Sequence, residues 1–310
     1  MAEPDVPAIR ALLRRWLDRR LEADGRDWVA ASLARLAAAA SEPELVRALD
    51  LAVGLASRRA GKRDLSLDPA DLAEADRARP GWDPRDLSCD QAARLLFVLA
   101  TVPDDAGSAG QDEAGFVRRL ERLWATADVG ELVAFLRGLP LYPDPARHVA
   151  RAAEGVRSNM TAVFRAVAHD NPYPAERFSE ATWNHMILKA LFVGVPLAPV
   201  HGLDRRANPD LARMLVDYAR ERRAARRPVP VDLWRCVGPH ADDAALAELA
   251  DLLRTGDPQE RAAAALALAA CPHPDAPALL AGVPDLAGAV ATGRITWDGL
   301  VPGSTEGEAR

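Results

Sequence analysis

The spacing of the apolar residues is the feature that most restricts what this chain can fold into. Between Trp28 and Ala37 the apolar positions are separated by steps close to three and four, as on one face of an α-helix. Strands instead favour β-branched and aromatic residues with a period of two. Here aromatic residues make up only 5% of the chain, and alanine and leucine dominate. The pattern therefore predicts an all-α fold.

Start and stop signals divide the chain into many short helices. Ser41, Asn208 and Asp257 can each cap a helix that has proline in its first turn. Gly138 and Gly194 each stand two residues before a proline and predict helix ends. We therefore expect helices over residues 4–23, 25–40, 43–59, 67–77, 88–101, 112–126, 128–138, 145–169, 179–193, 208–225, 230–236, 242–255, 257–271 and 275–290.

The C-terminal third has the pattern of stacked helix pairs. Residues 242–282 alternate helical segments with Gly-Asp-Pro and proline-rich turns, which resembles a HEAT-type repeat. Because a lone pair of amphipathic helices cannot bury its apolar faces, we expect an α-solenoid or an irregular, HEAT-like helical array. We also expect residues 103–111 to form a mobile loop. The predicted regions are an N-terminal helical region (1–140), a central region carrying the site (141–240), C-terminal HEAT-like helices (241–301) and a disordered tail (302–310).

Charge and hydrophobicity argue against two classes of partner. The chain has 39 basic and 45 acidic residues and a formal net charge of −6, which disfavours nucleic acid because phosphate binding needs concentrated positive charge. No apolar run is long enough to span a bilayer. The N-terminus has no basic segment leading into an apolar one, so we expect no signal peptide and a cytoplasmic location.

No motif points to a metal or a cofactor. The three cysteines, Cys89, Cys236 and Cys271, are far apart, and we expect small buried thiols. The patterns that bind nucleotide phosphates or dinucleotides, or that present a nucleophilic serine, are absent. Metal-ligand residue types occur in the centre of the chain without HExxH or a comparable spacing, so we expect no metal. These residues are His169, Asp170, His185, His201, Asp204, Asp217 and Glu221.

Residues 169–174 form the first unusual segment of the centre. Pro172 and Pro174 bias the residues before them, Asn171 and Tyr173, away from helical geometry, which predicts a stiff polar turn. A stiff turn suits ligand binding because it loses little conformational entropy on contact. The alternative is that its polar side chains only cap helix ends.

The next helix carries a lysine among apolar residues. Lys189 lies within MILKALFVGV, and His185 is four residues earlier, on the same face. A lysine in such a helix can titrate at a lowered pKa and serve as a base, a Schiff-base nucleophile or an anion clamp. It can equally reach solvent along its stem or form a structural ion pair.

Two carboxylates, Asp217 and Glu221, lie four residues apart on the following helix. On one helix face they could perform acid/base chemistry, or they could pair with neighbouring arginines. The connection before this helix carries Asp204 and Arg205, and loops over a rigid scaffold often hold binding groups. Tyr218 faces the core by its spacing.

Four segments together resemble the EboA-domain proteins. They read NMTAVFRAVAHDNPYPAERF, WNHMILKALFVG, GLDRRANPDLARMLVDYARER and VDLWRCVGP, and the close resemblance covers residues 151–239. Residues 196–204 and 219–229 depart in part from the family pattern, so no role is assigned to Arg220 or Arg223. The polar and aromatic residues that belong to the pattern are Asn159, Asn171, Tyr173, Trp183, Asn184, Lys189, Asp204, Arg205, Asn208, Asp217, Tyr218, Glu221 and Arg222.

The resemblance implies a setting rather than a reaction. Such proteins are encoded in bacterial clusters beside a prenyltransferase-like membrane protein, a dehydroquinate-synthase-like enzyme, a sugar-isomerase-like protein and hydrolases. These clusters are associated with secondary-metabolite assembly and with export of a pigment precursor. The resemblance therefore implies a protein that works with a small-molecule intermediate and with other enzymes of its cluster.

Our first functional hypothesis is the binding of a polar or anionic biosynthetic intermediate. Lys189 and Arg205 would bind its anion, and Asn171, Asn184 and Tyr218 would orient it. The wider predicted binding set is Asn159, Asn171, Tyr173, Asn184, His185, Asp204, Arg205 and Arg222.

Whether the protein is also an enzyme stays open. A cofactor-free isomerisation, elimination or cyclisation would use Asp217 or Glu221 as base and Lys189 or Tyr218 as acid. The alternative function is a non-catalytic helical scaffold that docks biosynthesis or export partners.

Overall fold

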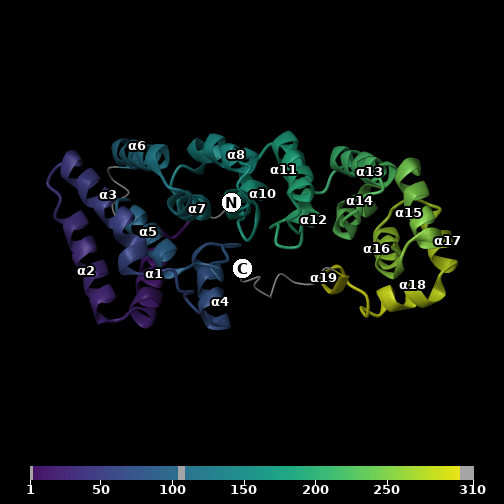
Figure 1. The fold of residues 1–310 in the computed structure, drawn as a ribbon, viewed down its shortest axis with the longest axis horizontal. Coiled ribbons are helices and arrows are strands. Elements are labelled where there is room, and N and C mark those ends of the chain that lie inside the picture. The colour runs from purple at the N-terminus through teal and green to yellow at the C-terminus, as the bar shows by residue number, and fades with distance from the viewer. Residues whose placement is uncertain (1–2, 104–108, 301–310) are drawn as a thin grey trace. The chain divides into compact units, whose positions relative to one another are not determined.

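The computed structural model describes residues 3–103 and 109–300 (Figure 1). Within these ranges the regular structure is helical, and one isolated bridge joins Asp64 and Ser88. The all-α prediction is confirmed. The tail predicted at 302–310, and residues 104–108 of the predicted loop, lie outside the described residues.

The chain divides into two compact units, Met1–Phe178 and Ser179–Arg310. The boundary falls inside the predicted central region, 141–240, and the division into three helical regions stays a prediction. The first unit contains α1 (Val6–Arg20), α2 (Ala23–Ala37), α3 (Glu42–Arg59), α4 (Pro69–Ala78), α5 (Cys89–Leu99), α6 (Ala109–Thr126), α7 (Val129–Arg137), the 3-10 helices η2 (Leu139–Leu141) and η3 (Pro145–His148), α8 (Val149–Arg157), α9 (Thr161–Ala168) and α10 (Tyr173–Arg177). The second unit contains α11 (Glu180–Val193), α12 (Leu203–Arg206), α13 (Pro209–Ala224), η4 (Val231–Leu233), α14 (Trp234–Val237), η5 (Gly238–His240), α15 (Asp243–Thr255), α16 (Pro258–Ala269), α17 (Ala276–Ala281), α18 (Pro284–Ala291) and α19 (Trp297–Leu300).

Capping side chains set several of the helix ends. The side chain of Asn208 accepts from the Leu211 amide at 2.8 Å and begins α13. Asp257 begins α16 with a capping box, and Gly194 ends α11 in the left-handed conformation, φ 72°. These three predicted boundaries are confirmed. Ser41 precedes α3 without a side-chain capping bond.

The single helix predicted over residues 145–169 is wrong. The structure has η3, α8 and α9 in its place, with a break at residues 158–160. The hydroxyl of Ser158 accepts from the amide of Met160 at 3.1 Å, and such a local bond competes with helical hydrogen bonding. The break matters because it turns the chain sharply between two helices that pack on each other.

Helix α5 is the centre of the first unit. It packs against α1, α3 and α7, and each of its residues except Gln91 is buried. Two of the buried residues are charged, and a buried charge is costly unless paired. Arg94 donates to Oδ2 of Asp90 at 2.7 Å and to the hydroxyl of Ser57 at 2.9 Å, which keeps this ion pair hydrogen-bonded inside the core.

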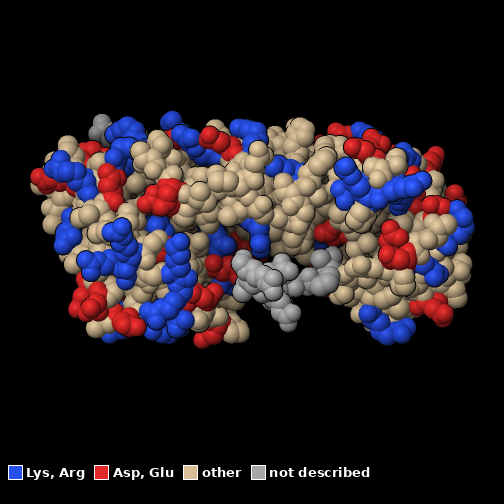
Figure 2. Space-filling view, viewed as in Figure 1, with Lys and Arg blue, Asp and Glu red and all other residues tan. Residues whose placement is uncertain are grey.

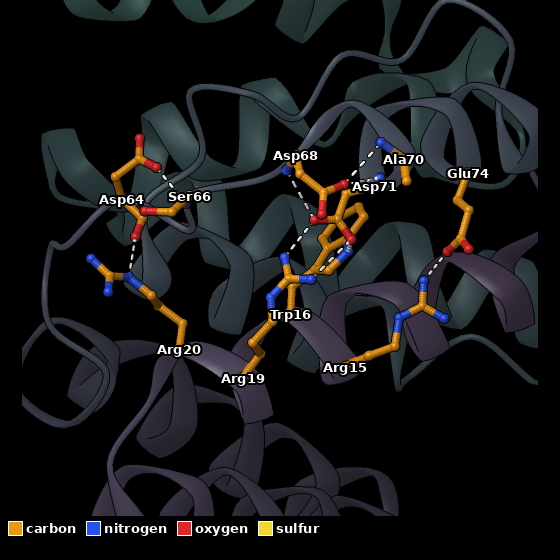
Figure 3. Close-up of polar contacts among 10 residues, drawn as sticks. All are labelled: Arg15, Trp16, Arg19, Arg20, Asp64, Ser66, Asp68, Ala70, Asp71 and Glu74. Atoms are coloured by element: carbon orange, nitrogen blue, oxygen red, sulfur yellow. Dashed lines mark hydrogen bonds and ion pairs between the residues drawn. The ribbon is translucent and has the colours of Figure 1, made fainter.

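A polar cluster joins α1 to α4 (Figure 3). The indole Nε1 of Trp16 donates to Oδ1 of Asp71 at 2.9 Å, and Arg19 donates to both carboxylate oxygens of Asp71. The hydrogen bond from Arg19 is the main reason that the pKa of Asp71 lies below its ordinary value. Asp71 also closes a capping box with Asp68 at the start of α4, so one side chain fixes both the start and the packing of that helix.

The second unit is built on α16. This alanine-rich helix packs against α14, α15, α17 and α18, and small side chains let the neighbouring backbone come close. Gly238 in η5 is one such point, since a Cβ there would lie 2.5 Å from the carbonyl oxygen of Ala267.

Figure 2 shows acidic and basic side chains interspersed over the visible surface of each unit. Within residues 3–103 and 109–300, no helix is both long enough and apolar enough to cross a bilayer.

Candidate functional site

The turn between α9 and α10 uses its polar groups internally. The buried Asn171 donates from Nδ2 to the carbonyl oxygens of Leu136 (3.1 Å) and Ala166 (3.0 Å), and its side-chain oxygen accepts from the Tyr173 amide (3.1 Å). The hydroxyl of the buried Tyr173 donates to the carbonyl of Pro145. These contacts fix the turn, as in the capping alternative, and a binding role for either residue stays a prediction.

Asp170 is the strained residue of that turn. Its φ of 50° lies in the left-handed region that side chains with a Cβ rarely adopt. Burial, together with repulsion from Asp83 and Asp86, raises the pKa of Asp170 to about 6. The cavity that it lines with His169 is only about 10 Å³, room for one water at most. The carboxyl group of Asp170 therefore has a raised pKa, but the cavity beside it is too small for a substrate.

Asn184 and Asn208 are partners of each other. Each amide nitrogen donates to the other's side-chain oxygen, at 3.1 and 2.9 Å, and both residues are buried. The oxygen of Asn208 also caps α13 through Leu211. The pair ties α11 to the start of α13, so the hydrogen bonds of the Asn184 side chain are explained by a structural role.

The predicted acid/base residues face different surroundings. The side chain of Asp217 is 79% exposed and Glu221 is also exposed, whereas Tyr218 is buried and donates to the carbonyl of Leu191 at 3.2 Å. Lys189 is half-buried, and burial lowers its pKa. Asp217 lines a shallow pocket of about 130 Å³ that does not include Tyr218. The structure therefore does not bring both carboxylates and the phenol together in this pocket.

The remaining predicted binding residues lie at the surface. Arg235 binds both carboxylate oxygens of the exposed Asp204, at 2.6 and 2.7 Å, and Arg222 donates to the carbonyl of Pro228 at 2.8 Å. Three further predicted residues are exposed: Asn159, His185 and Arg205. Over the described ranges, no cluster of three or more His, Cys, Asp or Glu side chains could hold a metal ion.

A larger pocket lies in the first unit, where α6, α7, α8 and α9 meet. We call it the Trp124 pocket and define it by Trp124, Leu132, Leu136, Arg151, Arg157 and Val163. In Figure 1 the helices α6, α7 and α8 lie next to one another, and α9 packs on both α7 and α8. The cavity volume is about 390 Å³, within the range of small-molecule sites.

The floor of the Trp124 pocket is apolar and its rim is charged. Arg151 lies over the Trp124 ring, 5.9 Å from its centroid, and is held by Glu121 at 2.7 Å and Glu154 at 2.9 Å. The buried Nε1 of Trp124 has no hydrogen-bond acceptor among the described residues, and an unsatisfied donor of this kind costs about 1–3 kcal/mol. The pocket thus combines an aromatic wall, aliphatic side chains and arginine at its edge.

Sequence reasoning missed this pocket because its walls come from four separate helices. Neither Trp124 nor Arg157 was given a functional role, and the predicted helix 145–169 concealed the break that shapes the pocket. A signal for the break was the pair Ser158 and Asn159, because such short polar side chains can compete with helical hydrogen bonding.

Another pocket of about 500 Å³ lies in the same unit, near Arg79 and Tyr142. Arg79 is buried, and its guanidinium donates to the carbonyls of Pro140 (2.9 Å) and Pro80 (3.0 Å) and to Glu176. Arg177 also lines this pocket, and its buried Nε has no hydrogen-bond partner among the described residues. The Trp124 pocket is the stronger candidate for a ligand because an aromatic ring and aliphatic side chains make up most of its lining, as in most small-molecule sites.

Comparison with known proteins identifies a family. A family model described as "Metabolite traffic protein EboA" matches residues 9–238, which include the Trp124 pocket and extend the resemblance far beyond residues 151–239. No curated protein and no solved structure matched the chain. Since the match covers well over half of the 310 residues, the chain belongs to the EboA family.

Proposed function

We propose that this protein binds a small-molecule metabolite in the Trp124 pocket and holds it without transforming it. The observation that carries the proposal is the cavity of about 390 Å³ with an apolar floor and a charged rim, a combination typical of ligand sites. The description of the family as metabolite traffic proteins supports the same conclusion. A protein that moves a metabolite needs reversible binding and no chemistry.

Holding is favoured over catalysis by the groups around the pocket. Its ionisable side chains are two arginines and Glu154, which is 64% exposed and paired with Arg151. Arginine stays charged at every physiological pH and is therefore a poor acid or base. Acid/base chemistry by Lys189, Asp217, Glu221 and Tyr218 remains a separate proposal, to be tested in its own right.

The scaffold function is a second proposal. It is supported by the packing of α15 against α16, the most extensively packed helix pair in the second unit and the one for which a HEAT-like repeat is expected. A solenoid of such pairs would offer an extended surface to enzymes of the same cluster, in a cytoplasmic setting. Binding of a metabolite by one unit and docking of a partner by the other are compatible.

A filled-pocket variant tests the proposed function. The full-length protein is titrated with N-phenyl-1-naphthylamine, a neutral aromatic probe that fluoresces in apolar sites. Leu132→Trp, in the pocket wall, is expected to abolish binding by occupying the cavity, whereas Leu51→Trp, at a half-exposed site on α3, leaves it unchanged.

Native mass spectrometry of the same proteins provides the second readout. A small molecule retained by the purified wild-type protein, and lost from Leu132→Trp, is the expected result. Equal probe binding by Leu132→Trp and the wild-type protein would contradict the proposal, provided that circular dichroism finds both proteins folded.

A further inference from the structure

We propose that the ligand of the Trp124 pocket is an acidic amphiphile, with an aromatic or aliphatic body against Trp124 and one anionic group at Arg157. This inference rests on the proposed function and adds the chemical class of the ligand. The anion can be a carboxylate, sulfate, sulfonate or phosphate, because a guanidinium binds each of them through the same charged hydrogen bonds.

The two arginines of the pocket differ in their partners. Arg151 is held by Glu121 and Glu154, so its charge is already balanced within the protein. Arg157, at the end of α8, is exposed and forms no ion pair with the residues that the structure describes. Arg157 is therefore the one arginine of the pocket lining that has no carboxylate partner among the described residues.

The entry into α9 adds further attraction for an anion. Ser158, Met160 and Val163 line the pocket and belong to the turn before α9 and to its first turn. The capping position of α9 is Met160, which provides no side-chain acceptor for the amides of that turn. Such amides and the positive end of the helix dipole favour a negative group, in addition to Arg157 and independently of it.

The remaining walls select an apolar body. Leu132, Leu136 and Val163 provide aliphatic contacts, and Met160, which also lines the pocket, is 46% exposed. Methionine adapts to ligands of different shape because its side chain is flexible and polarisable. A cationic ligand is disfavoured, because Arg151 already covers the Trp124 ring and Arg157 would repel it.

The experiment compares two probes that share one body and differ in one charge. These are 8-anilinonaphthalene-1-sulfonate and the neutral N-phenyl-1-naphthylamine, titrated into the full-length protein and two variants. Arg157→Gln removes the arginine of the pocket that has no carboxylate partner. Arg165→Gln removes another exposed arginine, on the neighbouring α9, that does not line the pocket.

We expect the sulfonate to bind about tenfold more tightly than the neutral probe, as one charged hydrogen bond would give. Arg157→Gln should remove most of that difference and leave the affinity of the neutral probe unchanged, and Arg165→Gln should change neither. Equal affinities for the two probes, or an Arg157→Gln protein that keeps the difference, would overturn the assignment of an anion. Binding of neither probe would instead contradict the proposed function itself, and this inference with it.

Discussion

Asn184 and Asn208 exchange two side-chain hydrogen bonds, of 3.1 and 2.9 Å, although 24 residues separate them in the sequence. The exchange satisfies both buried amides at once, and the oxygen of Asn208 also caps α13. The geometry therefore assigns both residues to the architecture of the second unit.

Replacing Asn208 with alanine should therefore destabilise the protein without any ligand present. The change removes a helix cap and leaves the amide of Asn184 buried without its partner, at a combined cost of about 2–4 kcal/mol. Urea unfolding followed by circular dichroism measures the loss. Asn159→Ala, at an exposed position, is the matched control and should change stability by less than about 0.5 kcal/mol. Equal stability of the two variants would contradict this account.

Asp71 should be essential to the packing of α1 on α4. Asp71→Asn weakens the bonds from Trp16 and Arg19 and should cost about 1–3 kcal/mol of unfolding free energy. Because the pKa of Asp71 is lowered in the folded protein, its contribution is present above the unfolded pKa and is lost as the pH falls through the folded pKa.

The control for Asp71 is Glu74→Gln. Glu74 pairs with Arg15 between the same two helices, but both side chains are more than a third exposed, so its loss should cost under about 1 kcal/mol. Unfolding curves at pH 7 and pH 3 separate the two variants. The Asp71→Asn deficit should shrink at the lower pH, and a deficit that stays constant would argue against the ionised carboxylate as its source.

The contribution of Asp170 to stability should depend on pH in the opposite sense to that of Asp71. Its folded pKa, about 6, is raised, so the folded state favours the protonated form. The contribution of Asp170 to folding stability is fully present below its unfolded-state pKa, near 4, and is lost as the pH rises through its folded-state pKa of about 6. Asp170→Asn should therefore stabilise the protein at pH 7.5 by about 1–3 kcal/mol, because asparagine keeps the polar side chain and tolerates positive φ.

Thermal unfolding between pH 4.5 and 7.5 tests the Asp170 prediction. The wild-type melting temperature should fall relative to that of Asp170→Asn as the pH rises, and Asp27→Asn, an exposed change on α2, should follow the wild type. Parallel curves for the wild type and Asp170→Asn would mean that the carboxyl group is not perturbed.

The sequence could predict the fold class and several helix ends because these are local properties. Spacing of apolar residues defines a helix, and Asn208, Asp257 and Gly194 act on their own neighbours. The sequence could not predict that Asn208 is the partner of Asn184, because hydrogen bonds between helices depend on how the helices pack. Helical spacing placed Asp217 and Glu221 on one face, but it does not reveal that this face is exposed.

The exposed carboxylates of α13 give a direct test of the catalytic alternative. If the Trp124 pocket is the ligand site, the double variant Asp217→Asn/Glu221→Gln should bind N-phenyl-1-naphthylamine with an affinity within about twofold of the wild type, as expected for surface changes away from a site. Any metabolite retained by the purified protein should also be retained by the double variant. Loss of that metabolite with unchanged probe binding would instead locate a second site on the second unit.

Gly238 should tolerate no side chain, because the backbone of α16 passes too close. A Cβ there would lie 2.5 Å from the carbonyl oxygen of Ala267 and 2.8 Å from its Cα, so η5 and α16 would have to separate. We expect Gly238→Ala to cost about 1–3 kcal/mol, the usual penalty of overpacking.

Gly288→Ala, in the interior of α18, is the control for Gly238→Ala. Apart from the adjacent residues and the backbone of α18 itself, no atom lies within 4 Å of the added Cβ, and alanine favours the helix over glycine by about 0.5–1 kcal/mol. The two variants add the same methyl group to the same unit, so their melting temperatures should move in opposite directions. A Gly238→Ala protein as stable as Gly288→Ala would mean that η5 is not held against α16, and the close packing described for the second unit would then be wrong.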